Sequence, residues 1–156
     1  MTPLKLIILD RDGTINEDRD DYVKSPDEWV PIPGALEAIA RLNHAGWHTV
    51  VATNQSGLAR GLFDTSALNA THTKMNQALA KVGGRIDAVF FCPHGPSEGC
   101  NCRKPLPGLF EMIAERAVQR DLAGLLQQCG IDGARRGAIR LLQDVSDALV
   151  RSRERR

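Results

Sequence analysis

Leu9-Asp10-Arg11-Asp12-Gly13-Thr14 ends an apolar run that begins at Leu4. The run predicts a buried strand over about residues 5–9. Side chains alternate along a strand, so we expect Asp10 and Asp12 to point the same way, with Gly13 allowing a sharp turn behind them. Two close carboxylates repel each other unless a hard cation such as Mg²⁺ offsets their charge. The same cation attracts a phosphate group, so the pattern predicts phosphoryl transfer onto a carboxylate.

Length, composition and charge are those of one folded domain. The chain has 156 residues, of which 42% are hydrophobic, so we expect residues 1–156 to form a single domain with its own core. The net charge of +1 gives no reason to expect nucleic acid or an anionic membrane as a partner. No apolar run approaches the ~20 residues of a transmembrane helix, and the N-terminus has no signal-peptide pattern. We therefore expect a cytoplasmic protein, and a monomer.

Apolar runs alternate with amphipathic stretches, which favours an α/β domain with a parallel sheet flanked by helices. Strands are expected at about 5–9, 47–52 and 86–91, and helices at 34–45, 65–82 and 107–120. His72, on the apolar side of the second helix, is expected to be a packed or surface residue rather than a ligand. Residues 16–33 predict a long polar loop broken by prolines. The segment Thr53-Asn54-Gln55-Ser56-Gly57 follows the second strand, at the end where open α/β sheets bind ligands.

Three cysteines and a histidine lie close together after the third predicted strand. Cys92, His94, Cys100 and Cys102 match the ligand set of a closed Cys₃His zinc site. The intervening residues include prolines and glycines without an obvious fold, so a structural Zn²⁺ would pin this loop. Cys129 lies apart and is not expected to be a ligand.

Two basic residues follow the last predicted zinc ligand directly. The pinned loop would aim Arg103 and Lys104 at the mouth of the sheet. A lysine there can neutralise a phosphoryl oxygen and the attacking carboxylate, and an arginine can bind a second anion through two hydrogen bonds. The alternative is a solvated basic pair, which the neighbouring zinc loop and acidic pair make the weaker interpretation.

Together, four motifs resemble the haloacid dehalogenase superfamily of phosphohydrolases, and within it the family of D-glycero-D-manno-heptose-1,7-bisphosphate 7-phosphatases. They are Asp-Arg-Asp-Gly-Thr-Ile-Asn from residue 10, Thr-Asn-Gln-Ser-Gly-Leu-Ala-Arg-Gly from residue 53, Cys-Pro-His from residue 92 and Cys-Asn-Cys-Arg-Lys-Pro from residue 100. The resemblance covers about residues 4–116. The histidinol-phosphate phosphatases share much of the pattern, including the zinc loop, and are the nearest alternative.

The resemblance implies a Rossmann-like fold and a two-step reaction. Asp10 would form an aspartyl-phosphate, and Asp12 would protonate the leaving sugar oxygen and then activate water. Thr53 and Lys104 would stabilise the transferring phosphoryl group. Arg103 would recognise the substrate, and the sugar pocket would be lined by Asp18, Arg19, Asp20, Asp21, Asn54, Gln55 and Ser56. Mg²⁺ would bind Asp10, the backbone carbonyl of Asp12 and one further acid, and the short span between Asp12 and Thr53 leaves no room for a large cap domain.

The C-terminal third departs from the superfamily pattern. A fourth motif, Gly-Asp with a second acid nearby, is expected some 25 residues after Lys104 and is not found. Asp132 is the best-placed substitute as a Mg²⁺ ligand, whereas Asp144 and Asp147 fit ion pairs on a divergent helical tail over 136–156. A missing acid would weaken Mg²⁺ binding strongly. Two alternative functions therefore stay open. The first is a zinc-stabilised phosphosugar-binding protein with little turnover, and the second, weaker one is a phosphotransferase that uses an acceptor other than water.

Overall fold

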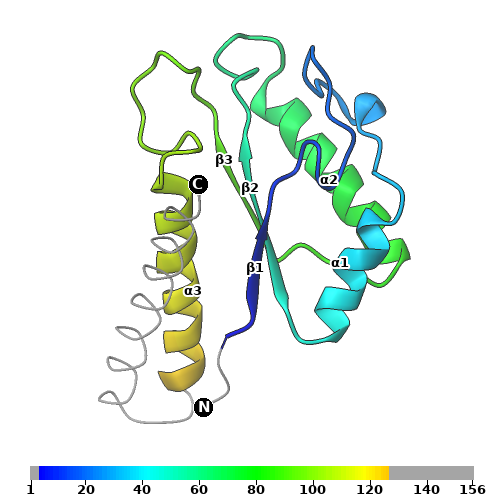
Figure 1. Ribbon diagram of the computed structural model, residues 1–156, viewed down its shortest axis with the longest axis vertical. Helices are drawn as coiled ribbons and strands as arrows, with labels where there is room; N and C mark the ends of the chain where they lie inside the picture. Colours follow the sequence, from blue (N-terminus) through cyan, green and yellow to red (C-terminus); the bar gives the residue numbers. More distant parts are fainter. Residues whose placement is uncertain (1–3, 127–156) are drawn as a thin grey trace. The chain divides into compact units, whose positions relative to one another are not determined.

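Within residues 4–126, three parallel strands form the sheet that carries the candidate site (Figure 1). They are β1 (Leu6–Leu9), β2 (His48–Asn54) and β3 (Ala88–Cys92), hydrogen-bonded in the order β1-β2-β3. The computed structural model describes residues 4–126 of the chain. Apolar side chains dominate all three strands, as expected for a parallel sheet that is covered by helices. The predicted α/β fold is confirmed.

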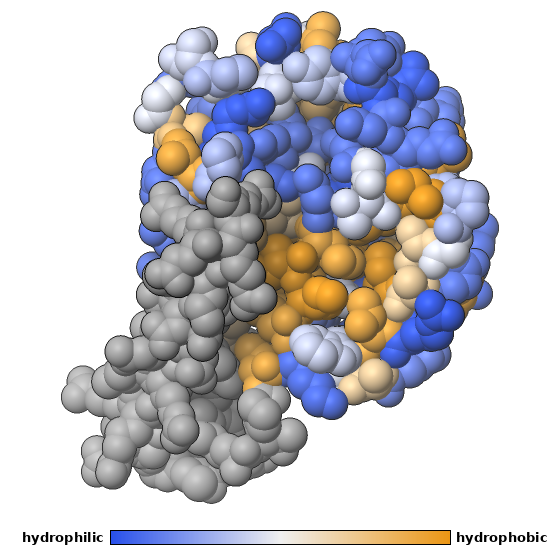
Figure 2. All heavy atoms as spheres, viewed as in Figure 1, coloured by the Kyte–Doolittle hydropathy of each residue, from blue (hydrophilic) through white to orange (hydrophobic). Residues whose placement is uncertain are grey.

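The register of the sheet brings the chemistry-bearing segments to one edge. Leu9 pairs with Val51, so the residues after β1 emerge beside the last residues of β2. At the other side of β2, Asn54 pairs with Cys92. Parallel strands end at the same edge of a sheet, where ligands of open α/β folds bind. Figure 2 shows hydrophilic side chains over the loops at this edge and hydrophobic ones over the strands below.

In the part of the chain that the structure describes, two helices cover one face of the sheet. Helix α1 (Ala35–His44) and helix α2 (Thr65–Lys81) lie on the same side of the strands in Figure 1. The side chain of Asp64 caps α2 by accepting a hydrogen bond from the Ala67 backbone. Between Leu9 and α1, the chain holds only a 3₁₀ helix, η1 (Pro26–Glu28), so no cap domain is inserted there.

The hydrophobic core lies between these helices and the sheet. It joins buried side chains of both helices and of β2 to residues of the β1–α1 connection: Ile15, Val23, Trp29, Leu36, Ile39, Val51, Met75 and Leu79. The prediction of a polar loop over residues 16–33 is therefore wrong in one respect. Val23 and Trp29 are almost fully buried, and their apolar area fixes the connection against α2 although it contains no long helix or strand.

The chain divides into two units, Met1–Leu109 and a second that starts at Phe110. All described residues of the candidate site belong to the first. Helix α3 (Gly108–Leu126) continues beyond its predicted end at residue 120. Asp132, Asp144, Asp147, Cys129 and the predicted tail over 136–156 lie outside the described residues. A single domain over the whole chain stays a prediction.

Among the residues that the structure describes, no helix combines the length and the apolar character needed to cross a bilayer.

Candidate active site

Asp10 stands at the carboxyl end of β1, and its carboxylate contacts a lysine from the loop after β3. Its Oδ2 lies 2.7 Å from the Lys104 ammonium nitrogen, and its Oδ1 accepts a hydrogen bond of 2.8 Å from the Arg11 backbone. The Asp10 side chain is 44% exposed, so an incoming ligand can reach it. A carboxylate paired with a lysine in an open position can approach a phosphate dianion, because the cation offsets the repulsion.

Lys104 is held from both sides of its backbone by one asparagine. The Asn54 side chain donates to the Lys104 carbonyl at 3.1 Å and accepts from the Lys104 N–H at 3.0 Å. The Lys104 ammonium also donates to the Ala52 carbonyl at 2.8 Å. Residues at the end of β2 therefore hold both the backbone of Lys104 and its ammonium group in place.

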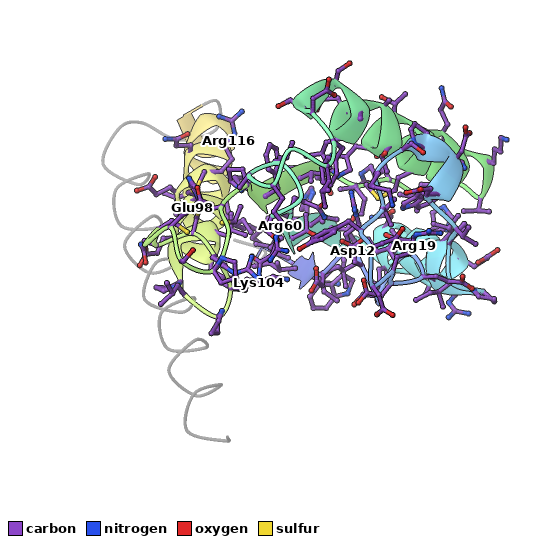
Figure 3. All side chains as sticks on the ribbon, turned by 90° about the horizontal axis from the view of Figure 1, so that it is seen from above. Asp12, Arg19, Arg60, Glu98, Lys104 and Arg116 are labelled. Carbon is purple, nitrogen blue, oxygen red and sulfur yellow. The ribbon has the colours of Figure 1, made fainter. Side chains whose placement is uncertain are left out.

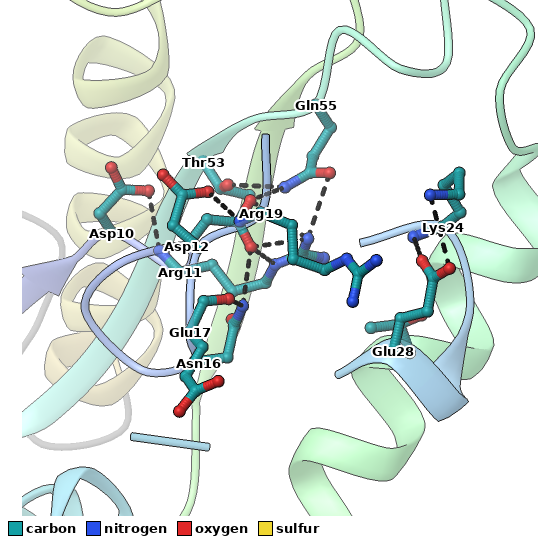
Figure 4. Close-up of polar contacts among 12 residues, drawn as sticks. Asp10, Arg11, Asp12, Asn16, Glu17, Arg19, Lys24, Glu28, Thr53 and Gln55 are labelled. Carbon is teal, nitrogen blue, oxygen red and sulfur yellow. Dashed lines mark hydrogen bonds and ion pairs between the residues drawn. The ribbon is translucent and has the colours of Figure 1, made fainter. Parts of the chain in front are cut away.

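Four side-chain donors hold the carboxylate of Asp12 (Figure 4). Arg11 donates from Nε to Oδ1 at 2.9 Å and from Nη2 to Oδ2 at 3.2 Å. Asn16 donates to Oδ1 at 3.0 Å, and Gln55 donates to Oδ2 at 2.9 Å. The turn behind Asp12 is the one predicted, since Gly13 has φ +75° and its N–H donates to the Asn16 carbonyl. Asp12 thus has a fixed orientation, as a group that transfers protons requires.

Gln55 connects Asp12 to Thr53. Its amide nitrogen donates to the Thr53 hydroxyl oxygen at 2.9 Å as well as to Asp12. Because that hydroxyl oxygen accepts from Gln55, its own hydrogen is directed elsewhere. Ser56, next along the chain, lies 3.3 Å from the hydroxyl of Tyr22. The segment predicted after β2 therefore contacts Asp12 directly, although Thr53 and Asn54 belong to the strand itself.

The acidic segment after the first motif lies at the same edge but is largely exposed. In Figure 3, seen from above, Arg19 and Lys104 lie on opposite sides of Asp12. Arg19 Nε donates to Asp21 at 3.0 Å, and Lys24 lies 2.7 Å from the other oxygen of Asp21. Hydrogen bonds from Lys24 and then Arg19 lower the pKa of the Asp21 carboxyl to about 2. Asp18 and Asp20 are exposed, and a sugar-binding role for all four residues at 18–21 stays a prediction.

The predicted zinc ligands come together. The ligand atoms of Cys92, His94, Cys100 and Cys102 all lie within 4.8 Å of one another. Cys92 and Cys100 have their sulfurs 3.7 Å apart, and His94 Nδ1 lies 3.3 Å from the Cys102 sulfur. Tetrahedral Zn²⁺ with ordinary Zn–S and Zn–N bonds requires separations of about 3.8 and 3.5 Å. The donor set and its spacing therefore fit one zinc ion, whereas a disulfide would require about 2.05 Å between sulfurs.

Cys92 is the most buried of the four predicted zinc ligands. It is the last residue of β3 and fully buried. Burial, with the neighbouring Cys102 thiol, raises the pKa of Cys92 to about 12 without a metal. A bound cation would deprotonate it, since metal ligation stabilises the thiolate. Arg103 is tied to this loop, because its Nη1 donates to the His94 carbonyl at 3.3 Å. Its predicted contact with the substrate stays a prediction.

The described residues also offer part of a Mg²⁺ site. Asp10 presents a carboxylate that is 44% exposed, although its two oxygens contact Lys104 and the Arg11 backbone, and both oxygens of Asp12 also accept hydrogen bonds. The binding of Mg²⁺ by Asp10 and by the backbone carbonyl of Asp12 stays a prediction. A hard cation takes such oxygen ligands. The predicted third acid, Asp132, lies outside the described residues.

Three buried residues at this edge were not predicted as site residues. Arg11 and Asn16 are 0% exposed, and His72 is 9% exposed, with Nε2 3.2 Å from Arg11 Nη1. The alternation of the strand contained one signal. If Asp10 and Asp12 face the mouth, Arg11 must face the interior, where an arginine requires partners. Nothing in the sequence indicated which helix would supply one.

Comparison with known proteins places these features in a family. The family model described as polynucleotide kinase 3 phosphatase matches residues 5–148. The chain is 65% identical over 122 residues to D-glycero-beta-D-manno-heptose-1,7-bisphosphate 7-phosphatase of Bordetella bronchiseptica, covering 78% of this chain and 68% of that protein. The enzyme of the same name from Pseudomonas aeruginosa is 53% identical over 120 residues, covering 77% and 67%. The chain thus spans about two thirds of the length of these relatives.

A solved structure agrees with the sequence matches. The crystal structure of D,D-heptose 1,7-bisphosphate phosphatase from B. bronchiseptica, complexed with magnesium and phosphate, superposes with a TM-score of 0.72 at 66% identity. The match covers 73% of this chain and 64% of that one. Fold, motifs and sequence identity agree, so the chain belongs to the polynucleotide kinase 3 phosphatase family and, within it, to the D-glycero-beta-D-manno-heptose-1,7-bisphosphate 7-phosphatases.

Proposed function

We propose that the chain is a Mg²⁺-dependent phosphatase that removes the 7-phosphate of D-glycero-D-manno-heptose 1,7-bisphosphate through an aspartyl-phosphate. The observation that carries the proposal is the arrangement of Asp10, Asp12 and Lys104 at one edge of the sheet. The two relatives with 65% and 53% identity, both named for this activity, support the substrate class.

The first step makes a covalent bond to the enzyme. A carboxylate oxygen of Asp10 attacks phosphorus while the bond from phosphorus to the sugar oxygen breaks. For this step Asp12 binds a proton on an oxygen in place of one of its neutral donors, Asn16 or Gln55, and gives it to the sugar oxygen, so the sugar leaves as a neutral alcohol. Lys104 and the hydroxyl of Thr53 supply donors to the phosphoryl oxygens, which carry the negative charge of the transition state.

The second step releases phosphate. Asp12, now ionised, takes a proton from water as the water oxygen attacks phosphorus, and the bond between Asp10 and phosphorus breaks. Asp12 ends protonated, as it began. Bound Mg²⁺ would neutralise the charge of Asp10 and of the phosphate and align them. The donors that stay bound to Asp12 keep its carboxylate in one place through both steps.

Zinc would have a structural role in this enzyme. Four protein ligands leave no open position for a substrate, so a Zn²⁺ in the Cys₃His cluster would stabilise the loop that carries Arg103 and Lys104. Three unoxidised thiols around such a site suit a reducing compartment, and we place the enzyme in the cytoplasm.

A substrate panel tests the proposal. Phosphate release from heptose 1,7-bisphosphate, heptose 1-phosphate and histidinol phosphate is measured with Mg²⁺ and with chelator. We expect the bisphosphate to be hydrolysed once, at position 7, only with Mg²⁺, and Asp10→Asn to abolish the reaction. Preferred hydrolysis of histidinol phosphate would reassign the substrate. Tight sugar-phosphate binding without turnover would favour a binding protein, and equal turnover by wild type and Asp10→Asn would refute the mechanism.

A further inference from the structure

Arg11 is a buried cation between the two acids of the first motif. Its side chain is 0% exposed, whereas the neighbouring carboxylates of Asp10 and Asp12 are 44% and 23% exposed. An arginine loses its hydration in such a position and is stable only where charged or polar groups replace the water. The groups that contact the guanidinium therefore decide whether its buried position is stable.

One edge of the guanidinium binds the carboxylate of Asp12. Nε and Nη2 donate to different oxygens of the same carboxylate, at 2.9 and 3.2 Å (Figure 4). Nη2 also lies 2.9 Å from Oδ1, so the guanidinium contacts both carboxylate oxygens, and two donors restrict the orientation of the carboxylate more than one donor does. The orientation of Asp12 therefore depends on the orientation of Arg11.

The outer nitrogens of the guanidinium have further partners, one on helix α2 and one directly after β2. Nη1 lies 3.2 Å from Nε2 of His72, and Nη2 also donates to the side-chain oxygen Oε1 of Gln55 at 3.3 Å. Arginine has donors only, so Nε2 of His72 must accept, and its ring proton must reside on Nδ1. Burial, and then the charge of Arg11, lower the pKa of His72 to about 4, which agrees with a neutral ring.

Helix α2 holds the backbone of His72 in a fixed position. Leu68 and Met75, one turn on either side, are 1% and 0% exposed, so this face of α2 is packed into the interior. A ring on such a face has little freedom to follow a moving partner. The contact therefore stabilises one position of the guanidinium.

We propose that His72 is a positioning residue, which holds the Arg11 guanidinium against Asp12 and thereby sets the carboxylate that transfers protons in the reaction. The inference rests on the proposed function for the identity of that reaction. Without the imidazole, Nη1 loses its partner in a buried place, and the guanidinium rotates towards other acceptors. Asp12 then keeps only Asn16 and Gln55 as fixed donors.

Three variants of the full chain separate positioning from packing. His72→Leu removes the acceptor and keeps an apolar side chain, whereas His72→Gln returns an acceptor oxygen near the position of Nε2. Met75→Leu alters the same buried face of α2 one turn away and serves as the packing control. We expect His72→Leu to lower kcat by about 10-fold to 100-fold with little change in KM, because proton transfer depends on placement. We expect His72→Gln and Met75→Leu to stay within about 3-fold of wild type in kcat.

A second measurement does not use turnover. In ¹⁵N-labelled protein, we expect the His72 ring to show the Nδ1–H tautomer and the Arg11 Nε–H signal to exchange slowly. His72→Leu should accelerate this exchange, and His72→Gln should restore slow exchange. If wild type hydrolyses no sugar phosphate, the proposed function fails, but these signals still test the contact. Unchanged Arg11 exchange and wild-type kcat in His72→Leu would overturn the inference, as would a His72→Gln variant as impaired as His72→Leu.

Discussion

The side chain of Asn54 makes two hydrogen bonds to the backbone of Lys104, one to its carbonyl and one from its N–H. Asn54 ends β2, and its neighbour across the sheet is Cys92, the first residue of the zinc cluster. Lys104 follows the last residue of that cluster after a single intervening arginine. Asn54 thus anchors Lys104, which faces Asp10, directly to the sheet. The cluster holds the loop before Lys104 at both of its ends, Cys92 and Cys102.

Removing the charge of Lys104 should impair chemistry more than binding. Lys104→Met should lower kcat by about 100-fold, because it removes a donor to the transferring phosphoryl group. Lys81→Met, at an exposed position at the end of α2, is the matched control and should behave as wild type. Steady-state kinetics of phosphate release measure both. A Lys104→Met variant with wild-type kcat would exclude the lysine from the reaction.

Cutting the link between β2 and the lysine should weaken catalysis without touching any charge. Asn54→Ala removes both hydrogen bonds to Lys104, and we expect kcat to fall by about 10-fold with the fold intact. Asn69→Ala, exposed on α2, controls for the loss of an asparagine. Circular dichroism checks the fold of each variant. Full activity in Asn54→Ala would mean that the zinc cluster alone suffices to place Lys104.

The cysteine cluster should hold one zinc ion per chain. Elemental analysis of protein purified without chelator should find about one Zn²⁺, and Cys100→Ser should lose it and melt at a lower temperature, because four ligands are needed to close the site. Cys129→Ser, which removes the cysteine outside the cluster, should keep the metal. Wild-type protein that contains no zinc and has unchanged stability and activity would refute a structural zinc site at this cluster.

Acid should destabilise the fold through His72. Its pKa is about 4 in the folded chain against 6.5 for an ordinary histidine, so the unfolded chain binds the proton more readily between these values. The stability contributed by the neutral ring is complete above about pH 6.5 and declines as the pH falls to about 4, by at most about 3 kcal/mol.

His72→Gln removes this titration and isolates it from the acid-sensitive zinc cluster. We expect the difference in unfolding free energy between wild type and His72→Gln to shift in favour of the variant as the pH falls from 6.5 to 4. Urea titrations at several pH values measure the difference. A difference that does not change with pH would show that His72 titrates normally.

The sequence indicated much of this architecture because its signals are local. The apolar runs placed all three strands within about two residues, and the cysteine spacing indicated a cluster that the geometry fits. Both depend on neighbours in the chain. The burial of Val23 and Trp29 could not be predicted from such local signals, because nothing in the polar, proline-rich stretch over 16–33 indicated that two of its residues enter the core.

Contacts between distant segments could not be predicted in the same way. The pattern could place Arg11 in the interior, but its partner His72 comes from a helix whose rotation relative to the sheet is set by packing. The double contact of Asn54 with Lys104 likewise depends on where the loop after β3 returns. A single sequence contains the donors and acceptors but not the distances that pair them.

The end of β2 sets the spacing for both halves of the reaction centre. Asn54 holds the backbone of Lys104, while Gln55, the next residue, donates to Asp12, the proposed proton-transferring acid. Consecutive residues in an extended chain point in opposite directions, so one strand end serves two neighbours at once. Inserting a single residue before Asn54 would exchange these directions and break both links together. Natural variation in chain length should therefore be excluded from this point and collect in the turns at the opposite edge.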